Sequence, residues 1–186
     1  AGGVTGSSSL YGRTSDPKTA GKSTTFGTVT AAGATAAIHH VSTYSCSSGR
    51  DTTDTCYSLD SYTVSKGTTN GIMRKTSDAY AGAAAVSATL YNGTAVFSCA
   101  KGGGADSEGG WIFTGGSGYK KVAVIAVTPG EVISYSVAAI VPGRRRNTYC
   151  YTYPNGCSSD GHDGEPGGPG GILVEYGGAI ETLAVG

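Results

Sequence analysis

The chain of 186 residues is long enough for one domain or two small ones, and its 13 Lys and Arg balance its 13 Asp and Glu. Only 14 % of the residues are charged, while 32 are Gly and 12 are Tyr, so the composition favours turns and strands over helices and disorder. The lack of a basic excess excludes nucleic acid as the main partner, and no apolar run is long enough to span a membrane.

Short β-branched runs bounded by turn residues predict an all-β fold. In chain order, the predicted strands are residues 23–31, 34–45, 56–65, 85–91, 94–100, 111–114, 119–127, 131–141, 147–153, 171–176 and 179–185. No segment has the 3.6-residue periodicity of an amphipathic helix. We expect a short-strand sandwich or a fibre-like β-domain that also contains glycine-rich, polyproline-II-like segments.

The composition of the chain changes near residue 100, and we place the domain boundary at residue 83. Residues 1–82 form a Ser/Thr-rich β-region, and residues 83–186 form a β-domain whose strands alternate with glycine tracts. This change predicts two domains. The chain begins at Ala1 and not at Met, as expected of a processed chain or an excised domain.

Four of the five cysteines form two short-range pairs. Cys46 and Cys56 flank a polar loop, and Cys150 and Cys157 flank a Pro-Asn-Gly turn. Neither spacing is that of a zinc site, so we predict two disulfides, each stabilising by about 2–3 kcal/mol, and an extracellular or virion-surface location. Cys99 is left over, either as a buried thiol or as one paired to another subunit.

Two turns in the middle of the chain have specific chemistry. Asn92 and Gly93 lie between apolar runs and predict a tight hairpin, because both turn positions need a positive φ; Asn92 is also a glycosylation candidate. Thr128-Pro129-Gly130 predicts a type II turn. The run KVAVIAV before it, residues 121–127, is apolar at nearly every position, so we expect both faces of that strand to be covered.

A basic and aromatic segment follows and is the candidate receptor-binding site. Its residues are Arg144, Arg145, Arg146, Tyr149, Tyr151 and Tyr153. Alternate tyrosines on a strand share one face, and Tyr and Arg are the residues that dominate binding hot spots. The segment is either a binding face for a glycan or protein, or a tyrosine ladder inside the sheet with solvated arginines.

The last glycine tract has a period of three, with Gly161, Gly164, Gly167 and Gly170 in strict spacing. This period is typical of a polyproline-II helix whose glycine face is pressed against a neighbour. We favour an ordered assembly element over a flexible linker, either one rod in a packed bundle of such rods or a short trimeric stalk. Nearby acidic residues could hold calcium, although a solvated loop is the preferred interpretation. They are Asp160, Asp163 and Glu165.

The C-terminal run, residues 179–185, and the start of the chain, residues 1–10, each lie outside an obvious hairpin. The apolar residues Ile180, Leu183 and Val185 of the C-terminal run could complete the sheet of a neighbouring copy by strand addition. This motivates a role in assembly.

From residue 87 to residue 176, several strings follow one another in an order that resembles a known family. They are VSATLYNGTAVFSC, KGGGADSEGGW, GGSGY, VTPG, VISYSV and PGGILVEY. This part of the chain resembles the glycine-rich C-terminal domain of bacteriophage tail-fibre proteins. The resemblance implies a trimeric, receptor-binding fibre tip whose loops between glycine-rich rods carry the receptor contacts.

Enzyme motifs are weak in this sequence. Gly21-Lys22-Ser23 lacks the glycine that a phosphate-binding loop needs five residues earlier, and no serine lies in G-x-S-x-G. We therefore expect a non-enzymatic structural or adhesive protein without cofactor or metal. A secreted, pilus-like filament subunit that assembles by strand exchange is the alternative, and a hydrolase of surface polymers is a residual one.

Overall fold

The computed structural model describes residues 20–47, 53–76, 80–89, 95–104, 110–143, 149–150, 157–158, 164–177 and 179–185. The residues it describes form short antiparallel strands and no helix, so the predicted all-β class is confirmed. The strands are β1 (Thr24–Phe26), β2 (Val29–Ala31), β3 (Ile38–Ser47), β4 (Thr53–Thr63), β5 (Met73–Thr76), β6 (Val86–Thr89), β7 (Ala95–Cys99), β8 (Gly110–Phe113), β9 (Tyr135–Ser136), β10 (Tyr149–Cys150), β11 (Cys157–Ser158), β12 (Gly171–Tyr176) and β13 (Ala179–Val185).

The strands pair in one three-stranded sheet and five two-stranded sheets. The three-stranded sheet has the order β2-β1-β9, and the pairs are β3–β4, β5–β8, β6–β7, β10–β11 and β12–β13. The β6–β7 pair is antiparallel, as the Asn92-Gly93 motif predicts, although residues 90–94 lie outside the described part of the chain. Each sheet formed by the described residues has only two or three strands.

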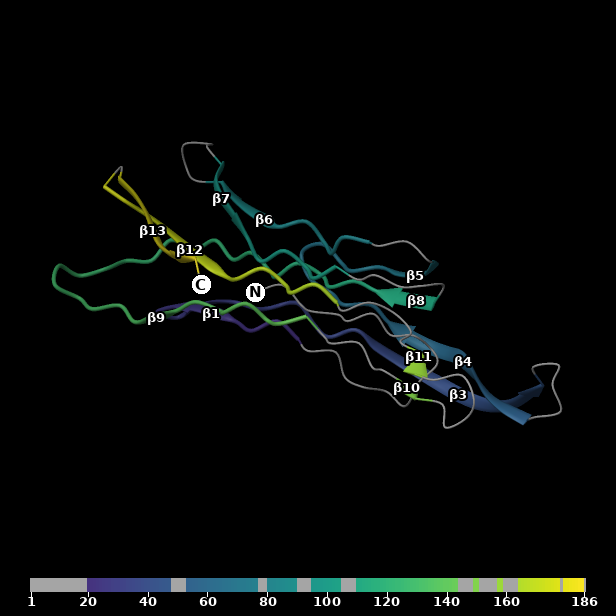
Figure 1. Ribbon diagram of the computed structural model, residues 1–186. Helices are drawn as coiled ribbons and strands as arrows, with labels where there is room; N and C mark the ends of the chain where they lie inside the picture. The colour runs from purple at the N-terminus through teal and green to yellow at the C-terminus, as the bar shows by residue number, and fades with distance from the viewer. Residues whose placement is uncertain are drawn as a thin grey trace.

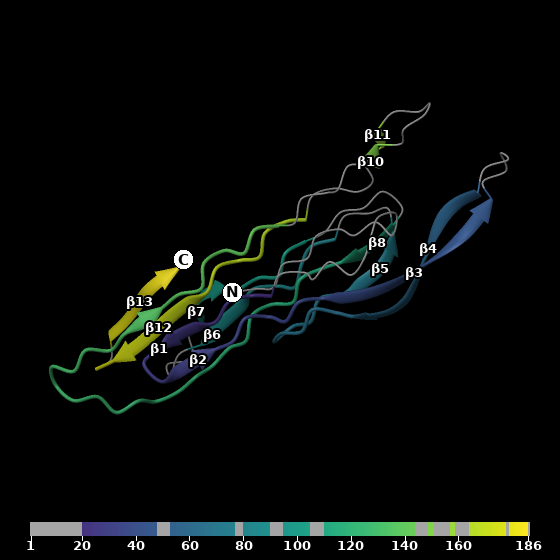
Figure 2. The same ribbon diagram turned by 90° about the horizontal axis from the view of Figure 1, so that it is seen from below.

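Extended segments that are not strands lie side by side along the middle of the molecule, as Figures 1 and 2 show. We call these segments the glycine-rich body. They are residues 32–37, 64–72, 81–85, 100–104, 114–118, 137–143 and 164–170. The strand pairs lie toward the two ends of this body, with β3–β4, β5–β8 and β10–β11 at one end and β1, β2, β9, β12 and β13 at the other (Figures 1 and 2).

Hydrogen bonds in the glycine-rich body run in more than one direction. The Gly102 amide donates to the Ala83 carbonyl (2.8 Å), Ala83 donates to Gly115 (3.0 Å), and Gly115 donates to Gly103 (2.8 Å). Three segments are therefore mutual neighbours, whereas the partners of a strand lie in the single plane of its sheet. The arrangement is a bundle of extended chains.

The glycines of the body are required because they have no Cβ atom. A Cβ on Gly102 would overlap the carbonyl of Gly115, and one on Gly103 would overlap the carbonyl of Glu165. Among the described glycines, only Gly27, Gly130 and Gly177 have a positive φ, so conformational freedom is not what the body needs. The body needs glycine at these positions because neighbouring backbones approach one another closely.

Buried hydroxyl groups satisfy the body's remaining backbone donors. The Ser65 hydroxyl donates to the Thr35 carbonyl (2.6 Å) and accepts from the Gly116 amide (2.8 Å). The Thr114 and Ser117 hydroxyls accept from Ile72 (2.9 Å) and Thr69 (2.9 Å) in the same way. A core of small residues thus leaves few buried polar groups unpaired.

Segment 164–170 belongs to this body. The Glu165 and Gly168 amides donate to Gly104 (3.0 Å) and Lys101 (2.8 Å), and the Gly167 and Gly170 amides donate to Val141 (3.1 Å) and Ala138 (2.8 Å). Gly164, Gly167 and Gly170 are buried, whereas Glu165 and Pro166 between them are exposed. The period of three therefore places glycines against neighbouring segments within the chain, while their role in assembly between copies stays a prediction.

Several predicted strands are wrong in extent or absent. The run 23–31 is a hairpin, because Gly27 adopts φ +55° and turns the chain between β1 and β2. Residues 119–127 form no strand, and of residues 131–141 only Tyr135–Ser136 do. In the described chain, β1 is the one strand that pairs with any of these residues, so their β-branched sequence has little to pair with.

Two observations correct the predictions at the other strands. The sequence patterns missed β5, which pairs with β8, and β11, which pairs with β10. The C-terminal strand β13 is not unpaired: it forms a hairpin with β12 through Gly177, at φ +52°, with Ile180 opposite Glu175 and Val185 opposite Gly171. The premise that residues 179–185 are a free terminal strand is therefore wrong, while residues 1–10 lie outside the described residues.

Residues on both sides of the predicted domain boundary contribute to the same sheets. The pair β5–β8 joins them, as does β1–β9. The Tyr119 amide also donates to the Ala32 carbonyl (2.9 Å), and the Ala138 amide donates to the Thr24 hydroxyl (3.1 Å). The division at residue 83 stays a prediction that this interleaving does not favour.

Candidate functional site

The hairpin β3–β4 projects from the glycine-rich body at the end that also carries β10–β11 (Figure 1). Tyr62 at its base meets the ring of the buried Phe113 edge-on, with the two centroids 6.2 Å apart, so it anchors the hairpin. Tyr44, farther along β3, is more than half exposed. An exposed aromatic side chain on a projecting hairpin is available for contact with a partner.

The same hairpin contains a β-bulge. The register shifts between His40 and Val41, which leaves Asp60 as the extra residue of β4. The Ser42 hydroxyl hydrogen-bonds the Asp60 carboxylate across the pair. Bulges re-aim neighbouring side chains and increase local twist.

The predicted receptor-binding segment is only partly described. Tyr149 lies in β10, opposite Ser158, at the hairpin end. Arg144, Arg145, Arg146, Tyr151 and Tyr153 lie outside the described residues. The same holds for Asn92, Gly161, Asp160 and Asp163, whose predicted roles therefore stay predictions.

The two cysteine pairs differ in backbone register. Cys150 lies directly opposite Cys157 in the antiparallel pair β10–β11. Cys46 lies opposite Asp54, and Cys56 lies opposite Tyr44, so these two cysteines are two residues out of line. Directly opposite Cα atoms are within the span of a disulfide, whereas diagonal ones are about 7–8 Å apart, beyond the usual 4.4–6.8 Å.

Cys99, at the end of β7, is a free thiol that is half-buried. Burial raises its pKa, because the charged thiolate loses hydration. Such a thiol is a poor nucleophile near neutral pH. No group of three His, Cys, Asp or Glu side chains suited to a metal ion occurs among the residues that the structure describes, and Glu165 is the one described member of the acidic patch.

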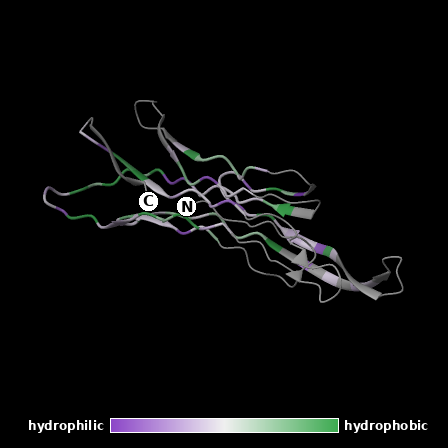
Figure 3. Cartoon of the chain, viewed as in Figure 1, coloured by the Kyte–Doolittle hydropathy of each residue, from purple (hydrophilic) through white to green (hydrophobic). Residues whose placement is uncertain are grey.

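The most exposed apolar surface is a feature that the sequence patterns placed wrongly. Residues 120–134, which we call the arm, extend from the body at the end opposite β3–β4 (Figures 1 and 2). Both of its limbs are apolar in Figure 3. Val122, Val124 and Val132 are 73 %, 88 % and 91 % exposed, so the expectation that both faces of 121–127 are covered is wrong for the single chain.

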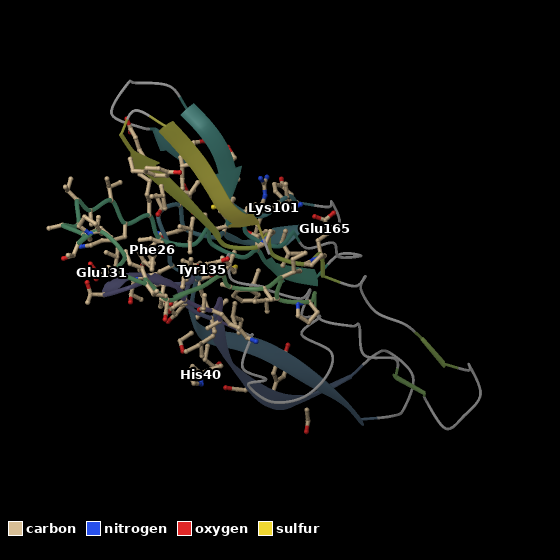
Figure 4. All side chains as sticks on the ribbon, turned by 90° about the vertical axis from the view of Figure 1, so that its left-hand side faces the viewer. Phe26, His40, Lys101, Glu131, Tyr135 and Glu165 are labelled. Atoms are coloured by element: carbon tan, nitrogen blue, oxygen red, sulfur yellow. The ribbon has the colours of Figure 1, made fainter. Side chains whose placement is uncertain are left out.

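The arm is nevertheless anchored at its base. The Tyr119 amide donates to the Ala32 carbonyl, and the Gly27 amide donates to the Ser134 carbonyl (both 2.9 Å). The Lys120 ammonium donates to the Ser87 carbonyl of β6 (3.2 Å). In Figure 4, Tyr135 lies beside Phe26, its partner in the β1–β9 pair, while Glu131 lies farther out.

The tip of the arm is a well-formed turn, as predicted for Thr128-Pro129-Gly130. The Glu131 amide donates to the Thr128 carbonyl (2.9 Å), and Gly130 has φ +83°, which is what a type II turn requires. The Glu131 carboxylate also accepts from the Thr128 amide (2.9 Å). The arm therefore presents its valines on an ordered support.

One signal could have identified the arm from sequence. Residues 121–127 are apolar at nearly every position, whereas residues 131–141, the strand predicted after the turn, contain Ser134 and Ser136, so a hairpin between the two would not cover both faces of the run. The apolar pattern of residues 121–127 predicts that these side chains are buried, but it does not identify the segment or molecule that buries them.

No helix that could cross a bilayer is present in the part of the chain that the structure describes. Comparisons with protein-family models, with curated proteins and with solved structures found no match to this chain.

Proposed function

We propose that this chain is a non-enzymatic, extracellular or virion-surface protein that acts as a receptor-binding module of the kind found at the tip of a phage tail fibre. The observation that carries the proposal is the close contact between neighbouring backbones in the glycine-rich body, as at Gly102 and Gly115. A body without a side-chain layer between its segments is stiff, because interiors packed to this density resist deformation. It holds hairpins and turns at its two ends, where a partner can reach them.

In this proposal the extended segments are polyproline-II-like rods of a fibre-like domain. Supporting features are the buried glycines at every third position of 164–170 and the hydrogen bonds from one segment to two neighbours. Only glycine permits such close approach in a period of three.

The receptor surface is the end that carries β3–β4 and β10–β11. Exposed Tyr44 and Tyr149 in β10, the described residue of the Arg/Tyr segment, belong to this end. Tyrosine and arginine offer apolar faces and hydrogen-bond donors that suit a cell-surface glycan or an acidic protein surface.

Binding to a glycan array and to whole cells tests the proposal. Arg145→Ala, Tyr151→Ala and Tyr44→Ala should each weaken binding by about tenfold or more, the usual effect of losing a hot-spot side chain. Tyr135→Ala is the matched control, since Tyr135 is equally exposed but lies at the opposite end. If all four variants bind like the wild type, the hairpin end is not the receptor surface.

The filament alternative lacks a comparable observation. Assembly by strand exchange needs a terminal strand without a partner, and β13 is hydrogen-bonded to β12 along its length.

A further inference from the structure

The arm combines an exposed apolar surface with unpaired backbone. Val122, Val124 and Val127 are 73 %, 88 % and 59 % exposed. Apart from the turn at the tip, residues 121–127 make no backbone hydrogen bond with any described residue. A β-branched run with free backbone donors and acceptors is a template for pairing with another strand.

The distribution of charge along the arm identifies the partner. Lys120 and Lys121 lie at its base, Glu131 lies at its tip, and the run between them is uncharged. Such an arm is complementary to an antiparallel copy of itself, because each basic end then meets an acidic tip.

One antiparallel register places the apolar residues of the run opposite apolar residues of the other copy. With Lys121 of one copy opposite Thr128 of the other, Val122 lies opposite Val127 and Val124 lies opposite Ile125. Lys121 then lies beside the turn in which the Glu131 carboxylate caps the Thr128 amide. Directly opposite residues lie side by side on the same face of a sheet, so the apolar side chains of the two copies contact one another across the pair.

We propose that residues 121–128 of two copies of this chain pair antiparallel and join the copies at their arms. The contact is isologous, with a two-fold axis between Val124 and Ile125, so it is complete in a dimer. It lies at the end of the molecule opposite β3–β4, which leaves the proposed receptor surfaces of both copies exposed. The proposal goes beyond receptor binding and does not depend on it.

Other occupants fit the arm less well. A lipid bilayer would meet the acidic side chain of Glu131 at the tip, where insertion begins, and burying such a side chain in lipid is unfavourable. Residues 1–19 contain Val4, Leu10 and Tyr11 as their large apolar side chains, too few to cover the run.

Sedimentation velocity of the full chain over a range of concentrations tests the proposal. We expect a reversible monomer–dimer equilibrium. Val124→Lys should raise the dimer Kd by about 100-fold, because symmetry places the change in the contact twice. Val132→Lys is the matched control: Val132 is as exposed as Val124 but lies on the returning limb, and we expect its Kd to match the wild type.

Charge reversal tests the register. Lys121→Glu and Glu131→Lys should each raise the dimer Kd by about tenfold, and the two changes in one chain should restore it. Circular dichroism checks that each variant folds.

Four results would overturn the proposal. They are a wild type that is monomeric at every concentration, a trimer or filament that Val124→Lys leaves intact, equal effects of Val124→Lys and Val132→Lys, and a double charge reversal that fails to rescue. Binding of the wild type to vesicles of anionic and neutral phospholipid, lost in Val124→Lys, would assign the arm to a membrane instead. Receptor binding is read from other residues, so either proposal can fail alone.

Discussion

Individual glycines decide how closely the extended segments approach. The Gly102 amide donates to the Ala83 carbonyl, and a Cβ at Gly102 would overlap the carbonyl of Gly115. At Gly177 the situation is opposite: φ is +52°, and nothing lies within 4 Å of an added Cβ. The same amino acid is therefore required for space in one place and for conformation in the other.

Substitution of these two glycines should separate the two effects. Gly102→Ala should destabilise the chain by about 3 kcal/mol, because the segments must move apart and lose hydrogen bonds to relieve the overlap. Gly177→Ala should cost only about 1 kcal/mol, the price of a left-handed backbone for alanine. Chemical denaturation measures both, and equal losses would contradict the close contact at Gly102.

Cys99 should react slowly in the native chain. Burial raises the pKa of its thiol, so less thiolate is present at a given pH than in the unfolded chain. Alkylation followed by peptide mapping should show Cys99 modified more slowly before denaturation than after it.

The same shift has a consequence for stability. The folded thiol holds its proton more tightly than the unfolded one, so its contribution is present below the unfolded pKa and is lost as the pH rises through the folded pKa. Cys99→Ser should remove this alkaline loss. An unchanged pH dependence in that variant would assign the loss to other groups.

At the scale of elements, short-range pairing could be predicted and long-range pairing could not. The type II turn at residues 128–131 is confirmed, and so is the antiparallel pairing of β6 with β7, although Asn92 and Gly93 themselves lie outside the described residues. The pair β5–β8 joins strands more than thirty residues apart, and Met73–Thr76 has no strand pattern of its own. Tertiary contact with β8 makes it a strand.

Backbone register also separates the two predicted disulfides. Cys150 and Cys157 lie directly opposite one another, so we expect them to be linked under oxidising conditions. Cys46 and Cys56 are two residues out of line, so we expect both to be alkylated without reduction. Peptide mapping of the non-reduced chain measures this, and a Cys46–Cys56 link would show that the register of β3–β4 shifts when the bond forms.

At the scale of the whole molecule, the body and the arm should differ in backbone protection. The buried amides of Gly102, Gly115, Gly168 and Gly170 donate to main-chain carbonyls, so they should exchange with solvent slowly. In the Val124→Lys variant, which stays monomeric, the backbone amides of residues 122 and 124 should exchange with solvent fast. Exchange that is as fast in the body as in the arm would contradict a stiff body.

The sequence by itself determined the all-β class, the turns at local motifs, and the glycines whose spacing marks close contact, because these depend on neighbours along the chain. Only the tertiary structure decided that the glycine tracts form a bundle, that β13 is paired within the chain, and that residues 121–127 stay exposed. Periodicity in the sequence indicates that an apolar face must be buried. Whether a distant segment of the chain or another molecule buries it depends on the tertiary structure.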